Sequence, residues 1–273
     1  MDKKHLITSG CSFTTGHNLG NPASWAYQLS NMKGLELHNR ARGGMGNQFI
    51  TNSIIGYLIE NPELISNSIV VVAWSEITRG LGTFTRPSDG KVELVTIRPQ
   101  DFIEDGSKGH WQIDADYYHG YTLKHSNIVS PYFSSWNYRI YETYVAMLNL
   151  KTFLELHKIP YLFFDAISDN KVMFNEKPNK MTTITLKDTF EDINLNEPIE
   201  SFMSCILNNK VLDEIFNNEN YISFYGHSMN DYMSADKLKL DRYTRGNGGH
   251  PNEYAANYFA KIILNEYERL YNK

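Results

Sequence analysis

The chain has 273 residues, of which 41% are hydrophobic and 21% are charged, and its formal net charge is −5 at pH 7. These values are typical of a soluble globular protein with a sizeable core. The acidic balance disfavours a general binder of nucleic acid or anionic membranes, which needs a basic surface. No segment approaches the length of a membrane span either. From the charge and the lack of such a segment together, we expect neither nucleic acid nor membrane as a partner.

The cysteines and the first residues bear on location. Cys11 and Cys205 are too few for a disulfide framework or a zinc signature. Lysines begin the stretch "MDKKHLITSG", but the apolar run after them is too short for a signal peptide. We therefore expect reduced thiols and a cytoplasmic location. Association with a phage or virion stays open, and no metal or cofactor is expected.

Apolar runs and helical patterns alternate along the chain. Buried strands are predicted at 5–10, 67–75 and 159–168, with weaker candidates at 35–41 and 220–226. Helices are predicted at 23–32, 46–61, 137–158, 201–218 and 251–271. This alternation predicts an α/β fold, a three-layer sandwich with a central parallel sheet.

Two polar segments interrupt the alternation. The first covers about 79–136, with a hairpin expected near 92–98, and the second covers about 169–200. We interpret 1–273 as a single domain that carries both segments as insertions, and such excursions often carry function. Many of the 18 tyrosines lie in 114–144. They either pack the first insertion or line a carbohydrate or protein contact.

Small hydroxyl and thiol residues crowd the end of the first strand, in "GCSFTTG" (10–16). Ligands of parallel α/β sheets bind beyond the carboxyl ends of the strands. Gly10 allows a tight turn there, which would place Ser12 near a helix start. A serine needs a base to act as a nucleophile. The best candidate is His250, in the glycine-rich turn before the last helix, unless it is only a polar residue at a helix start.

These two stretches resemble blocks of the SGNH, or GDSL-type, hydrolases. "GCSFTTG" is similar to their G-D-S-[FL]-T-x-G block, and "GHPNEYAANYFAKII" (249–263) to their terminal histidine block. "NRARGGMGNQFI" (39–50) and "VVVAWSEITRG" (70–80) occupy the places of the second and third blocks. The resemblance spans nearly the whole chain apart from the insertions, and it implies a flavodoxin-like sandwich.

Carried over by residue, the resemblance implies a catalytic site. Ser12 would be the nucleophile and its backbone N–H the first oxyanion donor. The second donor would be the N–H of Gly44, with Gly43 as the alternative. His250 would accept the Ser12 proton and later protonate the leaving group.

The sequence departs from the family pattern at three positions. Cys11 stands where the family has aspartate, and Ser75 aligns with a side-chain oxyanion donor that is normally asparagine. Asn247 replaces the aspartate three residues before the histidine. An amide can accept the imidazole N–H but cannot stabilise imidazolium by charge. Asp241 could substitute, or Ser12 and His250 could act as a dyad.

Other candidates are weaker. Cys11 is a rival nucleophile, but neighbouring residues point in different directions and Ser12 carries the resemblance. A possible metal group lacks a strong ligand spacing and is interpreted as a polar loop; it consists of His110, Asp114, Asp116 and His119. His227 is interpreted as structural. The stretch "GGMG" (43–46) lacks the lysine of a phosphate loop.

The leading hypothesis is a serine esterase or deacylase acting on a small or carbohydrate-linked ester, such as an O-acetyl group. One alternative is a ligand- or glycan-binding protein of the same fold without catalysis, because the Asn and Asp positions are altered. Another is a structural or interaction protein of a viral or surface assembly. An oligomer is compatible with each of these hypotheses.

Overall fold

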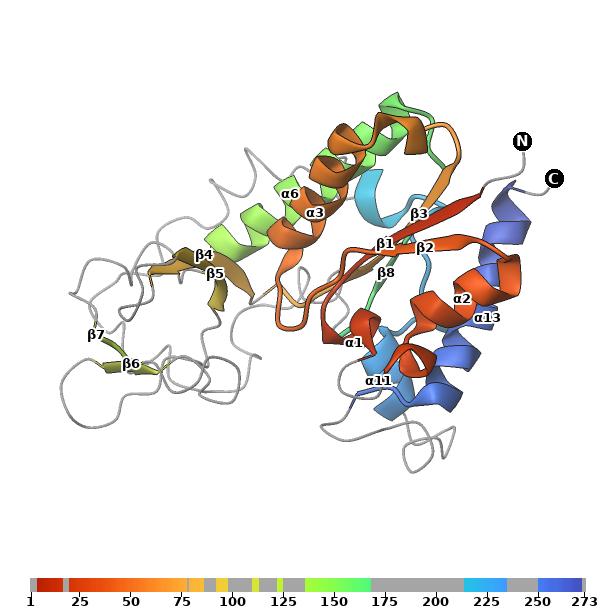
Figure 1. The fold of residues 1–273 in the computed structure, drawn as a ribbon. Coiled ribbons are helices and arrows are strands. Elements are labelled where there is room, and N and C mark those ends of the chain that lie inside the picture. The colour runs from red at the N-terminus through yellow and green to blue at the C-terminus, as the bar shows by residue number, and fades with distance from the viewer. Residues whose placement is uncertain are drawn as a thin grey trace.

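The computed structural model describes residues 4–16, 20–77, 79–85, 92–97, 110–112, 122–124, 136–167, 214–234 and 250–271. Its centre is a sheet of four parallel strands in the order β2-β1-β3-β8 (Figure 1). The strands are β1 (His5–Ser9), β2 (Glu36–Asn39), β3 (Ser68–Trp74) and β8 (Tyr161–Asp165). The predicted α/β class is thereby confirmed, as is the weaker strand prediction at 35–41.

Helices cover both faces of this sheet, which makes the three layers of the sandwich (Figure 1). On one face lie α2 (Trp25–Lys33) and α13 (Glu253–Tyr271), which contact each other. On the other lie α3 (Asn47–Glu60) and α6 (Trp136–Leu156). Shorter helical turns are α1 (Ser12–Thr15), η1 (Asn21–Ala23), η2 (Pro62–Leu64) and α11 (Met229–Ser234).

The core follows from the two-residue period of the strands. In β3, Val71 and Ala73 pack in the cluster under α2 and α13, whereas Val70, Val72 and Trp74 pack in the cluster under α3 and α6. Every residue of β3 is buried, as expected for a parallel strand covered on both faces. The continuous apolar run at 67–75 is therefore typical of a central strand that is covered on both faces.

Several predicted segments have different outcomes. The run 220–226 forms an isolated bridge from Tyr221 to Phe163 of β8 and no extended strand. In the expected helix 201–218, residues 214–216 are helical, and 201–213 lie outside the described residues. The first insertion contains two antiparallel hairpins, which are β4 (Gly80–Thr85) with β5 (Val92–Ile97), and β6 (His110–Gln112) with β7 (Thr122–Lys124). The second insertion lies outside the described residues.

A buried asparagine joins α3 to the end of β3. The Asn47 carboxamide oxygen accepts the Ser75 backbone N–H at 2.8 Å, and its nitrogen donates to the Ser75 carbonyl at 3.1 Å. The same nitrogen lies 3.4 Å from the Thr143 hydroxyl of α6. Asn47 is 1% exposed, so these bonds replace water that it cannot reach. Asn47 therefore locks the chain that leaves β3.

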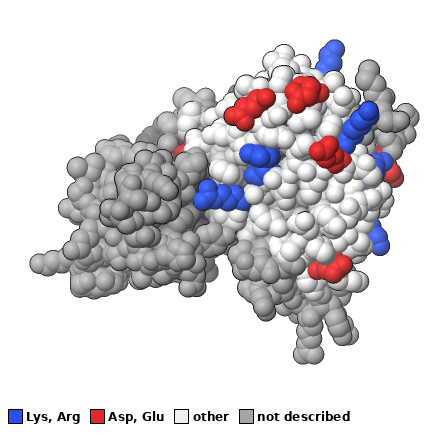
Figure 2. Space-filling model, in the orientation of Figure 1, with Lys and Arg blue, Asp and Glu red and all other residues white. Residues whose placement is uncertain are grey.

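The surface carries charges of both signs. On the face shown in Figure 2, Lys and Arg side chains are interspersed with Asp and Glu. Among the described residues, no helix combines the length and apolar character needed to cross a membrane.

Gly10→Ala should destabilise the protein by about 1–3 kcal/mol, because a Cβ at Gly10 would collide with the Thr14 side chain and lie 3.0 Å from the Ala73 carbonyl oxygen. The matched control is Gly56→Ala in α3, where a Cβ meets nothing within 4 Å. That change should stabilise by about 0.5–1 kcal/mol. Urea unfolding of both variants measures the difference, and equal effects at the two glycines would contradict the packing described at Gly10.

Asn47→Ala should cost about 2–4 kcal/mol of unfolding free energy, because it leaves the buried Ser75 peptide groups without their amide partner. Gln48→Ala is the control, since Gln48 is the next residue of α3 and is exposed. It should change stability by less than about 0.5 kcal/mol. A small effect of Asn47→Ala in urea unfolding would show that the bonds to Ser75 contribute little.

Candidate active site

The site begins where β1 ends. After Ser9 the chain turns through Gly10, and Cys11 forms the extended N-cap of α1, with φ −95° and ψ −156°. Ser12 is the first residue of that helix and is 6% exposed. By helix geometry, the first backbone N–H groups of α1 have no acceptor within the helix. The end of β1 thus presents both the Ser12 hydroxyl and its N–H beyond the sheet.

Neighbouring elements hold α1 through one carbonyl group. The Ser24 hydroxyl, at the N-cap of α2, donates to the Thr14 carbonyl at 2.7 Å. The Asn39 amide, at the end of β2, donates to the same oxygen at 3.2 Å. These two bonds satisfy a carbonyl that the short helix leaves without an intrahelical donor. They also anchor the short helix that carries Ser12.

The second loop runs beside the first. Beyond β2, the Arg40 N–H donates to the Thr8 carbonyl at 2.7 Å and the Arg42 N–H donates to the Gly10 carbonyl at 3.2 Å. These two bonds hold the start of the second loop, which continues to Gly44, beside the turn that leads to Ser12. Gly44 has a φ of 77°, a conformation that residues with a side chain rarely adopt. The glycine at the proposed second donor position is therefore explained by its backbone.

His250 reaches the site from the far end of the sequence. Its Nε2 atom lies 2.7 Å from the Ser12 hydroxyl oxygen, and its ring packs at 5.2 Å, centroid to centroid, from the Phe13 ring. Two residues later, the Asn252 side chain accepts the Ala255 N–H at 3.0 Å and so caps α13. Pro251 lies between His250 and this cap and is buried. A capped helix start that follows the buried Pro251 therefore positions the imidazole.

The third loop follows β3, the strand next to β1. Ser75 is fully buried, and its backbone is held by Asn47 as described above. Close by, the Arg79 guanidinium pairs with Glu76 at 2.8 Å, and Gly46 packs directly on the Arg79 carbonyl. These contacts place the second and third loops against each other. The donor role of Ser75 stays a prediction.

The remaining sequence candidates lie elsewhere. Cys11 is fully buried in the cluster under α2 and α13, so its thiol packs in the core while Ser12 faces His250. His227 is exposed in a turn that pairs with Phe224. The positions of Asn247 and Asp241, and of Asp114, Asp116 and His119, lie outside the described residues, and His110 is described only as part of strand β6.

Sequence reasoning did not find the residues that hold the loops in place. Asn47 was only part of a helical pattern, and Asn39 only the start of the second block. Ser24 follows "NPA", which marks a helix start, and this signal could have identified it as the cap. No local pattern indicates that Asn47 bonds to Ser75, because the contact joins two segments of the folded chain.

A search of protein-family models finds no match to the sequence, and a search of curated proteins finds none either. Solved structures do show similarity. An acetyl xylan esterase from the rumen bacterium Butyrivibrio proteoclasticus matches 98% of this chain with 10% identity and a TM-score of 0.43. This chain spans only 64% of the length of that esterase.

A second solved structure is a GDSL-like lipase from Bacteroides thetaiotaomicron. It matches 97% of this chain and 88% of its own, with 13% identity and a TM-score of 0.42. At these identities the likeness to both structures is one of fold alone.

Proposed function

We propose that the protein is a serine hydrolase that cleaves a carboxylic ester with Ser12 as the nucleophile. The supporting observation is the 2.7 Å separation of the Ser12 hydroxyl oxygen and the His250 Nε2 atom. That is the distance at which a histidine can take a serine proton. The pair also lies beyond the carboxyl end of β1, beside β3. In the order β2-β1-β3-β8 the chain goes from β1 to one side of the sheet, to form β2, and then to the other side, to form β3. Ligands of parallel sheets bind at such a switch point.

The reaction would proceed in two acyl-transfer steps. In the first, the Ser12 oxygen attacks the ester carbonyl carbon while its proton passes to His250 Nε2. The carbonyl oxygen becomes an oxyanion, for which the Ser12 and Gly44 N–H groups are the proposed donors, each worth about 3–4 kcal/mol of barrier. The C–O bond then breaks, and the imidazolium protonates the leaving alcohol. In the second step, water deprotonated by His250 hydrolyses the acyl-enzyme and frees the acid.

The proposed substrate is a small or carbohydrate-linked ester, such as an acetylated sugar. The tyrosines of 114–144 support this choice, because tyrosine combines a rigid flat ring with a polar hydroxyl. Ser75 is proposed as a third donor. Because its side chain is fully buried, the two backbone N–H groups are the main donors in this mechanism.

Ser12→Ala should lower the turnover of small acetyl esters by about 10³-fold or more and should abolish covalent labelling by a fluorophosphonate probe. Cys11→Ala is the matched control, because it removes the adjacent nucleophilic side chain and leaves Ser12 and His250 in place. It should retain turnover and labelling. If Cys11→Ala loses ester turnover and labelling while Ser12→Ala keeps both, the nucleophile would be the Cys11 thiol.

The same assay separates the alternatives. An unlabelled wild-type protein without esterase activity, but with affinity for glycans, would support a binding protein in which the site has lost catalysis. If the wild type shows neither esterase activity nor affinity for glycans and forms a large stable assembly in size-exclusion chromatography, a structural protein of a viral or surface assembly would be favoured.

Asn247→Asp should raise kcat by about tenfold or more if residue 247 faces the second ring nitrogen of His250. A carboxylate stabilises the imidazolium that forms during attack, and in serine proteases the reverse change lowers kcat about 10⁴-fold. Ester hydrolysis measured against pH, with Asn217→Asp as a control for added charge, tests this prediction. Equal rates for the wild type and Asn247→Asp would leave the Ser12–His250 dyad as the operating unit.

A further inference from the structure

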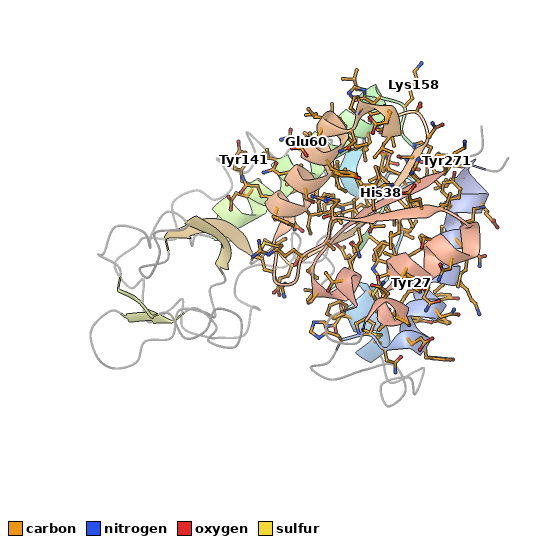
Figure 3. The ribbon with its side chains drawn as sticks, viewed as in Figure 1. Tyr27, His38, Glu60, Tyr141, Lys158 and Tyr271 are labelled. Atoms are coloured by element: carbon orange, nitrogen blue, oxygen red, sulfur yellow. The ribbon has the colours of Figure 1, made fainter. Side chains whose placement is uncertain are left out.

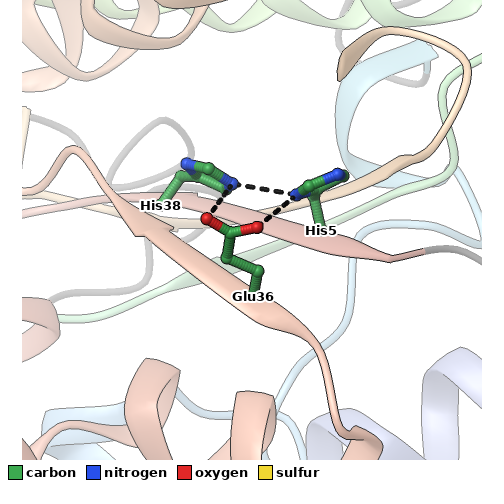
Figure 4. A group of neighbouring side chains, drawn as sticks. All are labelled: His5, Glu36 and His38. Carbon is green, nitrogen blue, oxygen red and sulfur yellow. Dashed lines mark hydrogen bonds and ion pairs between the residues drawn. The ribbon is translucent and has the colours of Figure 1, made fainter. Parts of the chain in front are cut away.

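Three side chains with metal-binding atoms meet across β1 and β2, as Figure 4 shows. The parallel register pairs His5 with Glu36 and places His38 two residues further along β2. His5 Nδ1 lies 3.0 Å from His38 Nε2 and 3.3 Å from a Glu36 oxygen, and His38 Nε2 lies 3.9 Å from the other Glu36 oxygen. Two imidazoles and a carboxylate therefore converge on one point.

These separations match those between ligands of one tetrahedral ion. With zinc bonds of about 2.0–2.1 Å, neighbouring ligand atoms of a tetrahedral site lie about 3.3 Å apart. The three measured distances lie on both sides of this value. Small rotations of the side chains would place an ion at bonding distance from all three, with a fourth position left for water.

A second contact orients one of the ligands. The Tyr57 hydroxyl of α3 lies 2.8 Å from His38 Nδ1, the ring nitrogen that does not face His5 and Glu36. Histidines that bind metals usually hold such a partner on the other nitrogen, which fixes the ring and its tautomer. The contact with Tyr57 of α3 places the His38 side chain on the side of the sheet that α3 covers, and Figure 3 labels His38 there. Tyr57 thus aims His38 Nε2 at His5.

Burial and charge at the cluster are also compatible with an ion. The side chains of His5 and His38 are 20% and 15% exposed, whereas that of Glu36 is 66% exposed, which leaves a path for an ion from solvent. The Glu36 carboxylate supplies a negative charge to an ion bound here. The Arg40 guanidinium stacks over the Tyr57 ring at 4.6 Å.

We propose that His5, Glu36 and His38 bind one divalent transition-metal ion of the zinc class. Nitrogen ligands favour Zn²⁺, Co²⁺ and Ni²⁺ over Mg²⁺ and Ca²⁺, which prefer oxygen alone. The ion would join β2, at the edge of the sheet, to β1. His5 and Ser9 are four residues apart on β1, or about 13 Å, so the ion lies away from Ser12 and stabilises structure without entering the reaction.

The test is zinc binding by the full chain without an affinity tag, after chelator treatment and dialysis. Isothermal titration with Zn²⁺ should give one ion per chain, and Co²⁺ should give the visible absorption of a tetrahedral site. His38→Gln should weaken Zn²⁺ binding by about 100-fold or more, and Tyr57→Phe by about tenfold. The melting temperature of the wild type should rise with Zn²⁺ and not with Mg²⁺.

Two further variants keep the result interpretable. Glu36→Gln changes a side chain that is 66% exposed, so it should weaken Zn²⁺ binding without unfolding the chain, even if the histidine variants unfold. His157→Gln is the control, because His157 is an exposed histidine whose ring lies 4.5 Å, centroid to centroid, from the Phe153 ring. This variant should bind Zn²⁺ like the wild type. Zinc binding of equal affinity in the wild type, Glu36→Gln and His38→Gln would overturn the proposal, as would no binding to the wild type. Neither result bears on Ser12.

Discussion

The central position of β1 is the constraint on which the site depends. This strand pairs with β2 on one side and β3 on the other, both in parallel, so three strand ends point to the same edge of the sheet. The segments that follow must then share the space beyond that edge. The Arg42–Gly10 backbone bond and the Asn47–Ser75 bonds tie these segments together. The loops are therefore held by the sheet, and a serine on the first of them has a defined direction.

The second requirement is a fixed start for the last helix. Ala255, Phe259 and Ile263 of α13 pack into the cluster that covers one face of the sheet, and the Asn252 cap sets where the helix begins. His250 precedes that cap and cannot move far while α13 stays packed. Hydrophobic burial along α13 therefore contributes to placing His250 beside Ser12. Packing and proposed chemistry are linked through one helix.

The two ends of the sheet differ in character. The carboxyl end holds Ser12 and His250, whereas the amino end of β1 and β2 holds His5 and Glu36 with His38 nearby. An edge strand is supported by backbone pairing on one side only, and among the described residues β2 is such a strand. Side-chain contacts among His38, Tyr57 and His5 tie it to α3 and β1. The position of β2 in turn supports Asn39, which holds the Thr14 carbonyl of α1.

The sequence by itself predicted the main strands and helices and singled out the candidate residues, because these signals are local. Buried runs predicted β1, β3 and β8, and the motif at 10–16 with the histidine at 250 singled out Ser12 and His250. The resemblance implied that His250 takes the Ser12 proton, but the contact itself joins residues 238 positions apart and exists only in the folded chain. The burial of the Cys11 side chain in the core is likewise decided by packing. The sequence likewise gives no signal for the Asn47–Ser75 bonds or for the His5–Glu36–His38 cluster. Such contacts depend on strand order, register and helix packing, and only the tertiary structure decides those.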